Sequence, residues 1–229
     1  MTTLQTVLFV APVLLFSVIA HEYAHGYAAL KQGDQTALML GRLTWNPIKH
    51  IDPFLTIIMP LIMVFTLGIA LGGAKPVPVN PRNYKNFKRG DIIVSLAGVA
   101  TNFVLALICT IIIAILGLLA RLIPALEPSL GILQVMMVVG IQINLGLLMF
   151  NLIPIPPLDG SHVMKYLLPP AWSFQYQRMG FLGLILLIVV MRAAPGFLNW
   201  WFGPADLVGN SLRYAVRALL TPTYFSWVT

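Results

Sequence analysis

Long apolar stretches, separated by short polar segments, set the pattern of this chain. A helix needs about 20 mostly apolar residues to cross the hydrocarbon core of a bilayer. Several stretches approach or exceed that length, so the pattern predicts an all-α polytopic membrane protein with additional C-terminal helices. The long apolar stretches are 4–30, 54–74, 92–123 and 130–154, followed by a shorter run at 180–190 and a mixed tail at 204–229.

Three polar segments interrupt this pattern, at 31–52, 75–91 and 154–178. The first contains LMLGRLTWN, which is compatible with a short membrane-associated β element. The second contains three prolines, which favour an extended backbone. We find no internal repeat and no appended soluble domain. We therefore predict a single domain over 1–229, with a core over about 4–175 and C-terminal helices over about 176–229.

The composition agrees with a membrane location. Of the 229 residues, 59% are hydrophobic and 9% are charged, whereas a soluble domain carries roughly 25% charged residues. This excludes an ordinary cytosolic enzyme, a disordered protein and a soluble nucleic-acid binder. The net charge of +7 is typical of basic cytoplasmic loops in a membrane protein and does not indicate a nucleic-acid partner. Only seven residues are acidic, so each acid requires an explanation.

The most unusual segment is HEYAH, residues 21–25, inside the first apolar stretch. His21 and His25 are four residues apart, so they lie on one face of a helix and can share a metal ion. Glu22 beside them completes the H-E-x-x-H pattern of zinc peptidases, in which the Glu is the general base. Ionisable groups inside an apolar helix are costly, which favours a functional site over a hydrogen-bonded trio buried between helices.

A catalytic zinc ion usually has three protein ligands and a water. The candidates for the third ligand are the remaining acids, His50 and His162. Asp159 is favoured because it ends NLIPIPPLDG, a segment whose prolines break the helix and leave irregular backbone. Such backbone is tolerated at membrane depth only where it lines a cavity or is buried in protein. The alternative is that Asp159 caps the helix that follows it.

The chain resembles the site-2 protease family of intramembrane zinc metalloproteases, peptidase family M50. The resemblance rests on HEYAH, on NLIPIPPLDG and on SLAGVATN at 95–102. The segments GRLTWNPIKHIDP and AKPVPVNPRNYKNFKRGD are similar to the compact prokaryotic branch, which lacks PDZ and CBS domains. The resemblance covers roughly residues 10–175. One departure is Val99, where the family commonly has proline.

This resemblance implies the roles of individual residues. It implies His21, His25 and Asp159 as the ligands of one Zn²⁺ per chain, carried by a core of three transmembrane helices. It implies Glu22 as the base that activates water, and Asn151 as a residue that holds the developing oxyanion or the substrate carbonyl. Asn151 as a plain helix-end residue is the alternative. The reaction would be hydrolysis of a peptide bond within or next to a transmembrane segment of a substrate protein in the lipid bilayer.

The positions of the motifs constrain the topology. HEYAH lies late in its apolar stretch and Asp159 follows the end of 130–154, so these two helices must run in the same direction to share a metal. Two apolar stretches lie between them, and one must therefore not cross. The stretch 54–74 contains one proline and three glycines, and we predict that it is re-entrant. The basic segments on either side of it then face the cytoplasm, toward which the active site would open.

Four residues are predicted to bind the substrate. An unwound substrate could pair with an edge strand near 38–44, which places Gly41, Arg42 and Leu43 beside it. Asn102 is a further candidate, although packing between helices is the alternative for this residue.

Two other functions fit the motifs: a metal-ion transporter and a zinc-binding pseudoprotease. The chain is predicted to be a multi-pass protein of a prokaryotic cell membrane, and its oligomeric state is not indicated.

Overall fold

The structure, a computed structural model, describes residues 3–58 and 73–228. These residues are helical or irregular, and no strand occurs among them. The chain divides into two compact units. The motif unit comprises Val18–Thr101 and contains HEYAH. The bundle unit comprises Met1–Ser17 and Asn102–Thr229.

Three long helices correspond to the first, third and fourth predicted spans. They are α1 (Thr3–Gln32), α4 (Phe87–Leu122) and α5 (Glu127–Asn151). Each contains a stretch long and apolar enough to cross a membrane. The helix α4 begins five residues before the apolar stretch at 92. The reason is a cap, because the Asn86 side chain accepts a hydrogen bond from the Arg89 amide at 2.9 Å.

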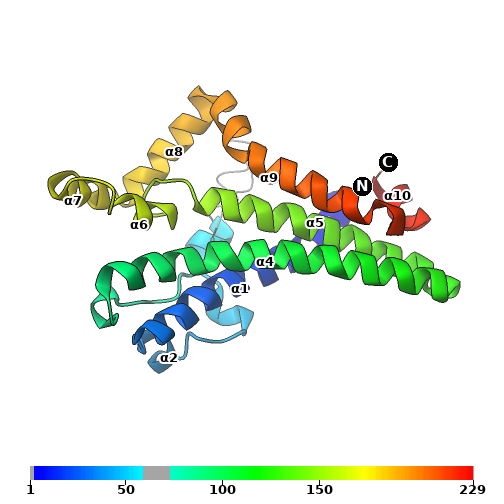
Figure 1. The fold of residues 1–229 in the computed structure, drawn as a ribbon, viewed down its shortest axis with the longest axis horizontal. Helices are drawn as coiled ribbons and strands as arrows, with labels where there is room; N and C mark the ends of the chain where they lie inside the picture. The colour runs from blue at the N-terminus through cyan, green and yellow to red at the C-terminus, as the bar shows by residue number, and fades with distance from the viewer. Residues whose placement is uncertain (1–2, 59–72, 229) are drawn as a thin grey trace. The chain divides into compact units, whose positions relative to one another are not determined.

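The core of the bundle unit lies between α4, α5 and the C-terminal helices. The short 3₁₀ turn η4 (Pro124–Leu126) joins α4 to α5. Ala106 and Ile113 of α4 and Ile141 of α5 have no exposed surface. Figure 1 shows α9 (Pro195–Val216) running alongside α5, which also packs against α10 (Pro222–Val228). The apolar core of this unit therefore covers the part of α5 between Val135 and Leu145.

A buried hydrogen-bond network joins three helices of the bundle unit, α1, α4 and α5. The Asn102 amide donates to the Asn144 side-chain oxygen at 2.9 Å. The Asn144 amide in turn donates to the Ser17 hydroxyl and to the Gly140 carbonyl, each at 2.9 Å. Ser17, Asn102 and Asn144 are at most 1% exposed. Hydrogen bonds between apolar helices restrict the rotation of each helix about its own axis. This network therefore sets which face of each helix points inward.

The C-terminal region differs in detail from the prediction. The run at 180–190 forms α8 (Phe181–Ala193), which is too short to be a span on its own. The predicted tail at 204–229 has no boundary at Pro204, because α9 continues through that residue. After the turn η5 (Arg217–Leu219), the chain is held by α5. Gln134 accepts from the Thr221 amide at 3.0 Å, and Glu127 accepts from the Thr223 amide at 2.9 Å.

The predicted edge strand at 38–44 is wrong. Thr36–Met39 is the short helix α2, and the residues after it form turns. The cause is Asp34, whose carboxylate accepts hydrogen bonds from the Thr36 amide and hydroxyl and starts a helical turn. The chain continues through the 3₁₀ turn η1 (Pro47–His50) and the π-helical turn η2 (Pro53–Ile58). Of the predicted re-entrant stretch 54–74, residues 59–72 lie outside the described residues.

The segment that follows α5 folds back on the end of that helix. Ile153 and Leu158 of this irregular segment are buried against Leu187 of α8, whereas Pro154 and Pro157 are exposed. A Cβ atom on Gly160 would lie 2.3 Å from the Leu152 carbonyl oxygen, so only glycine permits this approach. The segment ends at α6 (Gly160–Met164) and is followed by α7 (Pro170–Arg178).

Candidate metal centre

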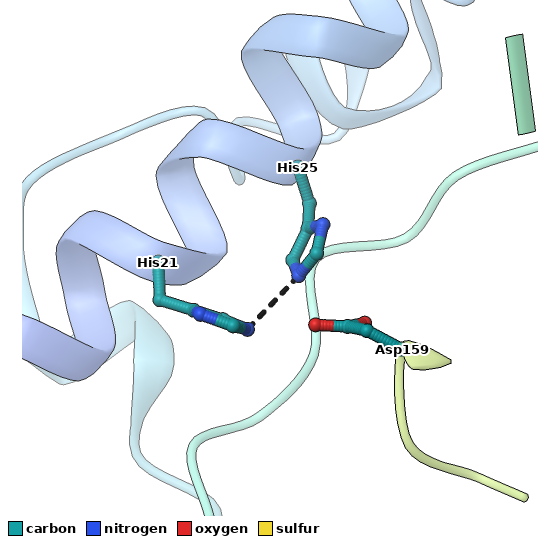
Figure 2. A group of neighbouring side chains, drawn as sticks. All are labelled: His21, His25 and Asp159. Carbon is teal, nitrogen blue, oxygen red and sulfur yellow. Dashed lines mark hydrogen bonds between the residues drawn. The ribbon is translucent and has the colours of Figure 1, made fainter. Parts of the chain in front are cut away.

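The two histidines of HEYAH project from the same side of α1, as their spacing predicts (Figure 2). Their Nε2 atoms lie 3.0 Å apart, and the rings meet edge to face with centroids separated by 4.6 Å. His21 is 7% exposed and His25 is 9% exposed. The helix therefore presents two imidazole nitrogens to one point in a nearly water-free environment.

A carbonyl of α4 determines which nitrogen of His25 carries hydrogen. His25 Nδ1 lies 2.7 Å from the Val94 carbonyl oxygen, which can only accept, so Nδ1 is the donor. In the neutral ring the lone pair is then on Nε2, the atom that faces His21. Metal-binding histidines characteristically donate their second nitrogen to such an acceptor, which orients the ring and fixes the tautomer.

Gly98 of α4 provides the space for both rings. A Cβ atom at this position would lie 2.5 Å from His21 Cε1 and 2.6 Å from Nε2 of each histidine. The helix backbone therefore approaches the imidazoles as closely as glycine allows. The two nitrogens converge, the tautomer of His25 is fixed, and Gly98 leaves room beside both rings. This donor set fits zinc, which binds imidazole nitrogen.

Glu22 lies beside the pair and has a main-chain partner. Its Oε2 atom accepts a hydrogen bond from the Val77 amide at 2.8 Å. Val77 belongs to the proline-containing segment after residue 74, which has no regular secondary structure. Glu22 is only partly buried, so its carboxylate combines one fixed contact with access to solvent or substrate.

The other two residues of the predicted centre belong to the bundle unit. Asp159 stands immediately before α6, where its side chain makes no capping hydrogen bond, so the cap alternative is not supported. It is the third residue of the group drawn in Figure 2. Asn151 is the last residue of α5, and its amide donates to the Leu147 carbonyl at 3.0 Å. This is the helix-end arrangement that was the alternative for Asn151.

The predicted substrate-binding residues make contacts within the protein. Arg42 donates to the Lys75 carbonyl at 2.9 Å, and Leu43 packs next to Gly26 of α1. Gly41 is exposed and has a φ of +62°, which marks a turn. Asn102 is the buried interhelical donor described above, in agreement with the packing alternative.

The remaining histidines have other partners. His50 is 1% exposed, and its Nε2 atom donates to the Thr44 carbonyl at 2.8 Å. It therefore holds the loop after α2. His162 lies in α6, 3.4 Å from the Lys165 ammonium. Neither contact is that of an additional metal ligand.

Three main-chain features of the site escaped sequence reasoning: the Val94 carbonyl, the Val77 amide and the absence of a side chain at Gly98. Backbone groups leave no signature in residue type, which explains the first two. Gly98 does have a signal, because it stands in SLAGVATN near the start of a long apolar helix. A glycine there predicts close helix packing, but its partner is evident only from the tertiary structure.

Comparison with known proteins gives a consistent result. Residues 9–135 match the model of peptidase family M50. A Bacillus subtilis protein provisionally named zinc metalloprotease YwhC is 38% identical over 193 residues, covering 82% of each chain. A Mycobacterium tuberculosis protein provisionally named zinc metalloprotease Rip2 is 29% identical over 216 residues, covering 93% of this chain and 78% of its own. No solved structure matches the chain.

Proposed function

The chain belongs to peptidase family M50, and from this premise we propose that it is an intramembrane zinc metalloprotease. It hydrolyses a peptide bond within or next to a transmembrane segment of a substrate protein. The observation that carries this proposal is the histidine pair of α1, with two Nε2 atoms 3.0 Å apart and His25 oriented by Val94. Burying two imidazoles inside an apolar helix costs free energy, and binding a metal ion would offset that cost.

His21 and His25 bind the zinc ion through Nε2, and Asp159 supplies the third ligand. The assignment of Asp159 is supported by its place at the end of NLIPIPPLDG and by the lack of a capping role. Zinc, when bound, polarises the scissile carbonyl and lowers the pKa of water at the site.

Glu22 is the general base of the reaction. Its neighbour along α1 is a ligand, so its carboxylate is adjacent to the place where water attacks. It takes the proton from the attacking water and delivers it to the leaving amine. Asn151 donates its second amide hydrogen to the carbonyl oxygen as negative charge develops there. The apolar surroundings of the spans exclude bulk water and strengthen these interactions.

Replacing His21 with Ala tests the metal assignment. We expect purified wild-type protein to contain one zinc per chain and to cleave a model transmembrane substrate. His21→Ala should lose both properties, because the remaining ligands bind the ion too weakly to retain it. His162→Ala is the matched control and should keep its zinc. Elemental analysis and cleavage assays measure the two results, and a His21→Ala protein with wild-type zinc content would contradict the assignment.

We propose that the chain enters and leaves the stretch 54–74 on the same side of the membrane. Two hydrogen bonds that close this segment support the proposal. The Lys75 amide donates to the His50 carbonyl at 2.8 Å, and the Thr56 hydroxyl donates to the Gly73 carbonyl at 2.8 Å. Residues on either side of the segment are therefore neighbours, as a re-entrant path requires.

The contacts at the helix ends agree with this path. The Lys85 amide donates to the Gln32 carbonyl, at the last residue of α1, at 2.8 Å. Asp34 accepts from the Asn80 amide at 2.6 Å. The end of α1 and the start of α4 are thus neighbours, and we infer that they lie at one membrane face together with the eight basic residues of these segments. They are Lys31, Arg42, Lys49, Lys75, Arg82, Lys85, Lys88 and Arg89. The positive-inside rule places this face in the cytoplasm of a prokaryotic cell.

Cysteine labelling tests the topology. The single native cysteine is first removed as Cys109→Ala. The exposed positions Gln35 and Arg82 are then replaced by Cys one at a time, with Ala125 in the turn between α4 and α5 as the opposite-side control. In intact cells, a membrane-impermeant thiol reagent should label Ala125→Cys alone. Labelling of Gln35→Cys and Arg82→Cys from different sides would refute the re-entrant path.

A further inference from the structure

An extended segment, Lys75–Asn80, lies against the helix that carries Glu22. We call it the strap. Three of its residues, Lys75, Val77 and Asn80, precede prolines, which disfavours helical backbone and keeps them extended. Its middle residue, Val77, is 6% exposed and donates its amide to Glu22. Resting on the proposed function, we infer that the strap is a positioning element that holds the Glu22 carboxylate for proton transfer.

Both ends of the strap are anchored independently of Glu22. At the first end, the Lys75 amide donates to His50 and the Lys75 carbonyl accepts from Arg42. At the other end, the Asn80 amide donates to Asp34. Burial raises the pKa of the Asp34 carboxyl, but hydrogen bonds from Asn80, Thr36 and Asn83 outweigh this and hold the pKa below its ordinary value. Asp34 is therefore a charged anchor at neutral pH.

The prolines of the strap and its two anchors together permit only one register. Pro76 and Pro78 have no amide hydrogen, so Val77 is the single donor between them. A shift by one residue in either direction would place a proline opposite Glu22 and leave the carboxylate without this partner. A shift by two would break the anchors at both ends. Alternation of donor and non-donor residues thus specifies which amide meets the base.

Gly26 of α1 fixes the depth at which Val77 lies. A Cβ atom on Gly26 would lie 2.9 Å from Val77 Cγ1 and 3.1 Å from Leu43 Cδ1. Val77 therefore packs directly on the helix backbone, one turn after Glu22. The main-chain donor holds Oε2, which restricts the rotation of the carboxylate and leaves Oε1 for the reaction. A main-chain donor anchored at both ends has less freedom than a side chain, which is why it suits this role.

Hydrogen exchange in zinc-free protein tests the contact without relying on activity. Within the strap only Lys75, Val77, Val79 and Asn80 have exchangeable main-chain amides. We expect the Val77 amide to exchange at least about tenfold faster in Glu22→Ala than in Glu22→Gln, because glutamine retains an acceptor. The Lys75 and Asn80 amides, whose acceptors are elsewhere, serve as internal controls. Equal Val77 exchange in the two variants would overturn the inference.

Kinetics of two Val77 variants test the function of the contact. Val77→Pro removes the donor, and Val77→Ala keeps it while shortening the side chain. We expect kcat of Val77→Pro to fall by about 10- to 100-fold relative to Val77→Ala, with KM little changed, which is the range for residues that orient a catalytic group. Equal kcat values would overturn the inference. A higher kcat for Val77→Pro would do so too, because it would identify the strap as an inhibitory cover.

A second route covers the case in which Val77→Pro does not fold. Gly26→Ala pushes Val77 away from α1 and should lower kcat, and Val77→Ala in the same protein removes the clashing Cγ1 atom and should restore it. Absence of this rescue would contradict the role of the strap in positioning Glu22.

The outcomes separate this inference from the proposed function. If Glu22→Gln is inactive while the strap variants behave alike, the inference fails and the proposed function stands. If wild-type protein neither binds zinc nor cleaves, both fail.

Discussion

Replacing Glu22 with Gln is expected to lower the rate of peptide hydrolysis by at least about 100-fold while leaving the zinc content of the protein unchanged. Glutamine has the same shape and can still accept from the Val77 amide, so the local structure is preserved. It cannot take a proton from water, and general-base catalysis typically contributes about 10²- to 10⁴-fold. We expect kcat to fall by that factor. Single-turnover cleavage of a transmembrane substrate, paired with elemental analysis, measures both quantities.

The chain offers a matched control for this substitution. Glu127, its only other glutamate, binds Thr223 near the C-terminus. Glu127→Gln makes the same chemical change away from the histidine pair and should keep kcat within a few-fold of wild type. A Glu22→Gln protein with more than a tenth of wild-type kcat would remove Glu22 from the role of general base.

Replacing Gly98 with Ala is expected to empty the metal site. The added Cβ would lie 2.5–2.6 Å from atoms of both imidazoles, well inside contact distance. The rings must then turn away, which separates the two Nε2 atoms and breaks the bond from His25 to Val94. Alanine is also a better helix former than glycine, by about 1 kcal/mol, so α4 itself should not be weakened. We expect zinc affinity to fall by at least about 100-fold.

The control for this prediction is Gly146→Ala in α5. A Cβ atom there would meet no atom within 4 Å, so the same substitution in another apolar helix should leave zinc content and cleavage intact. Zinc titration and thermal unfolding of both variants give the comparison. Normal zinc binding by Gly98→Ala would show that the histidines do not need the space that this glycine provides.

The sequence predicted the elements of this fold whose cause is local. Three apolar stretches became α1, α4 and α5 because about 20 apolar residues in succession form a helix wherever a bilayer is the solvent. The pairing of His21 with His25 followed from four-residue spacing alone, since helical periodicity places such residues on one face. The start of α4 was missed because a polar cap at Asn86 extends the helix beyond its apolar part.

The error at 38–44 shows where local pattern fails. Its apolar residues suit a strand as well as a helix, and the Asp34 carboxylate favours a helical turn at the start of this segment. Arg42, predicted to bind a substrate, donates a hydrogen bond to the strap residue Lys75, which is 33 positions away along the chain. The secondary-structure propensities of the two segments do not predict this contact.

By itself, the sequence determined the membrane class, the long helices, the HEYAH pair and the family. Each depends on residue type and on spacing within one element. Only the tertiary structure decided that Val94 orients His25, that Gly98 makes room for both rings and that Val77 meets Glu22. These contacts are made by backbone groups of segments distant in sequence. Every residue except proline has the same backbone donor and acceptor, so only the packed fold can select which of them a side chain meets.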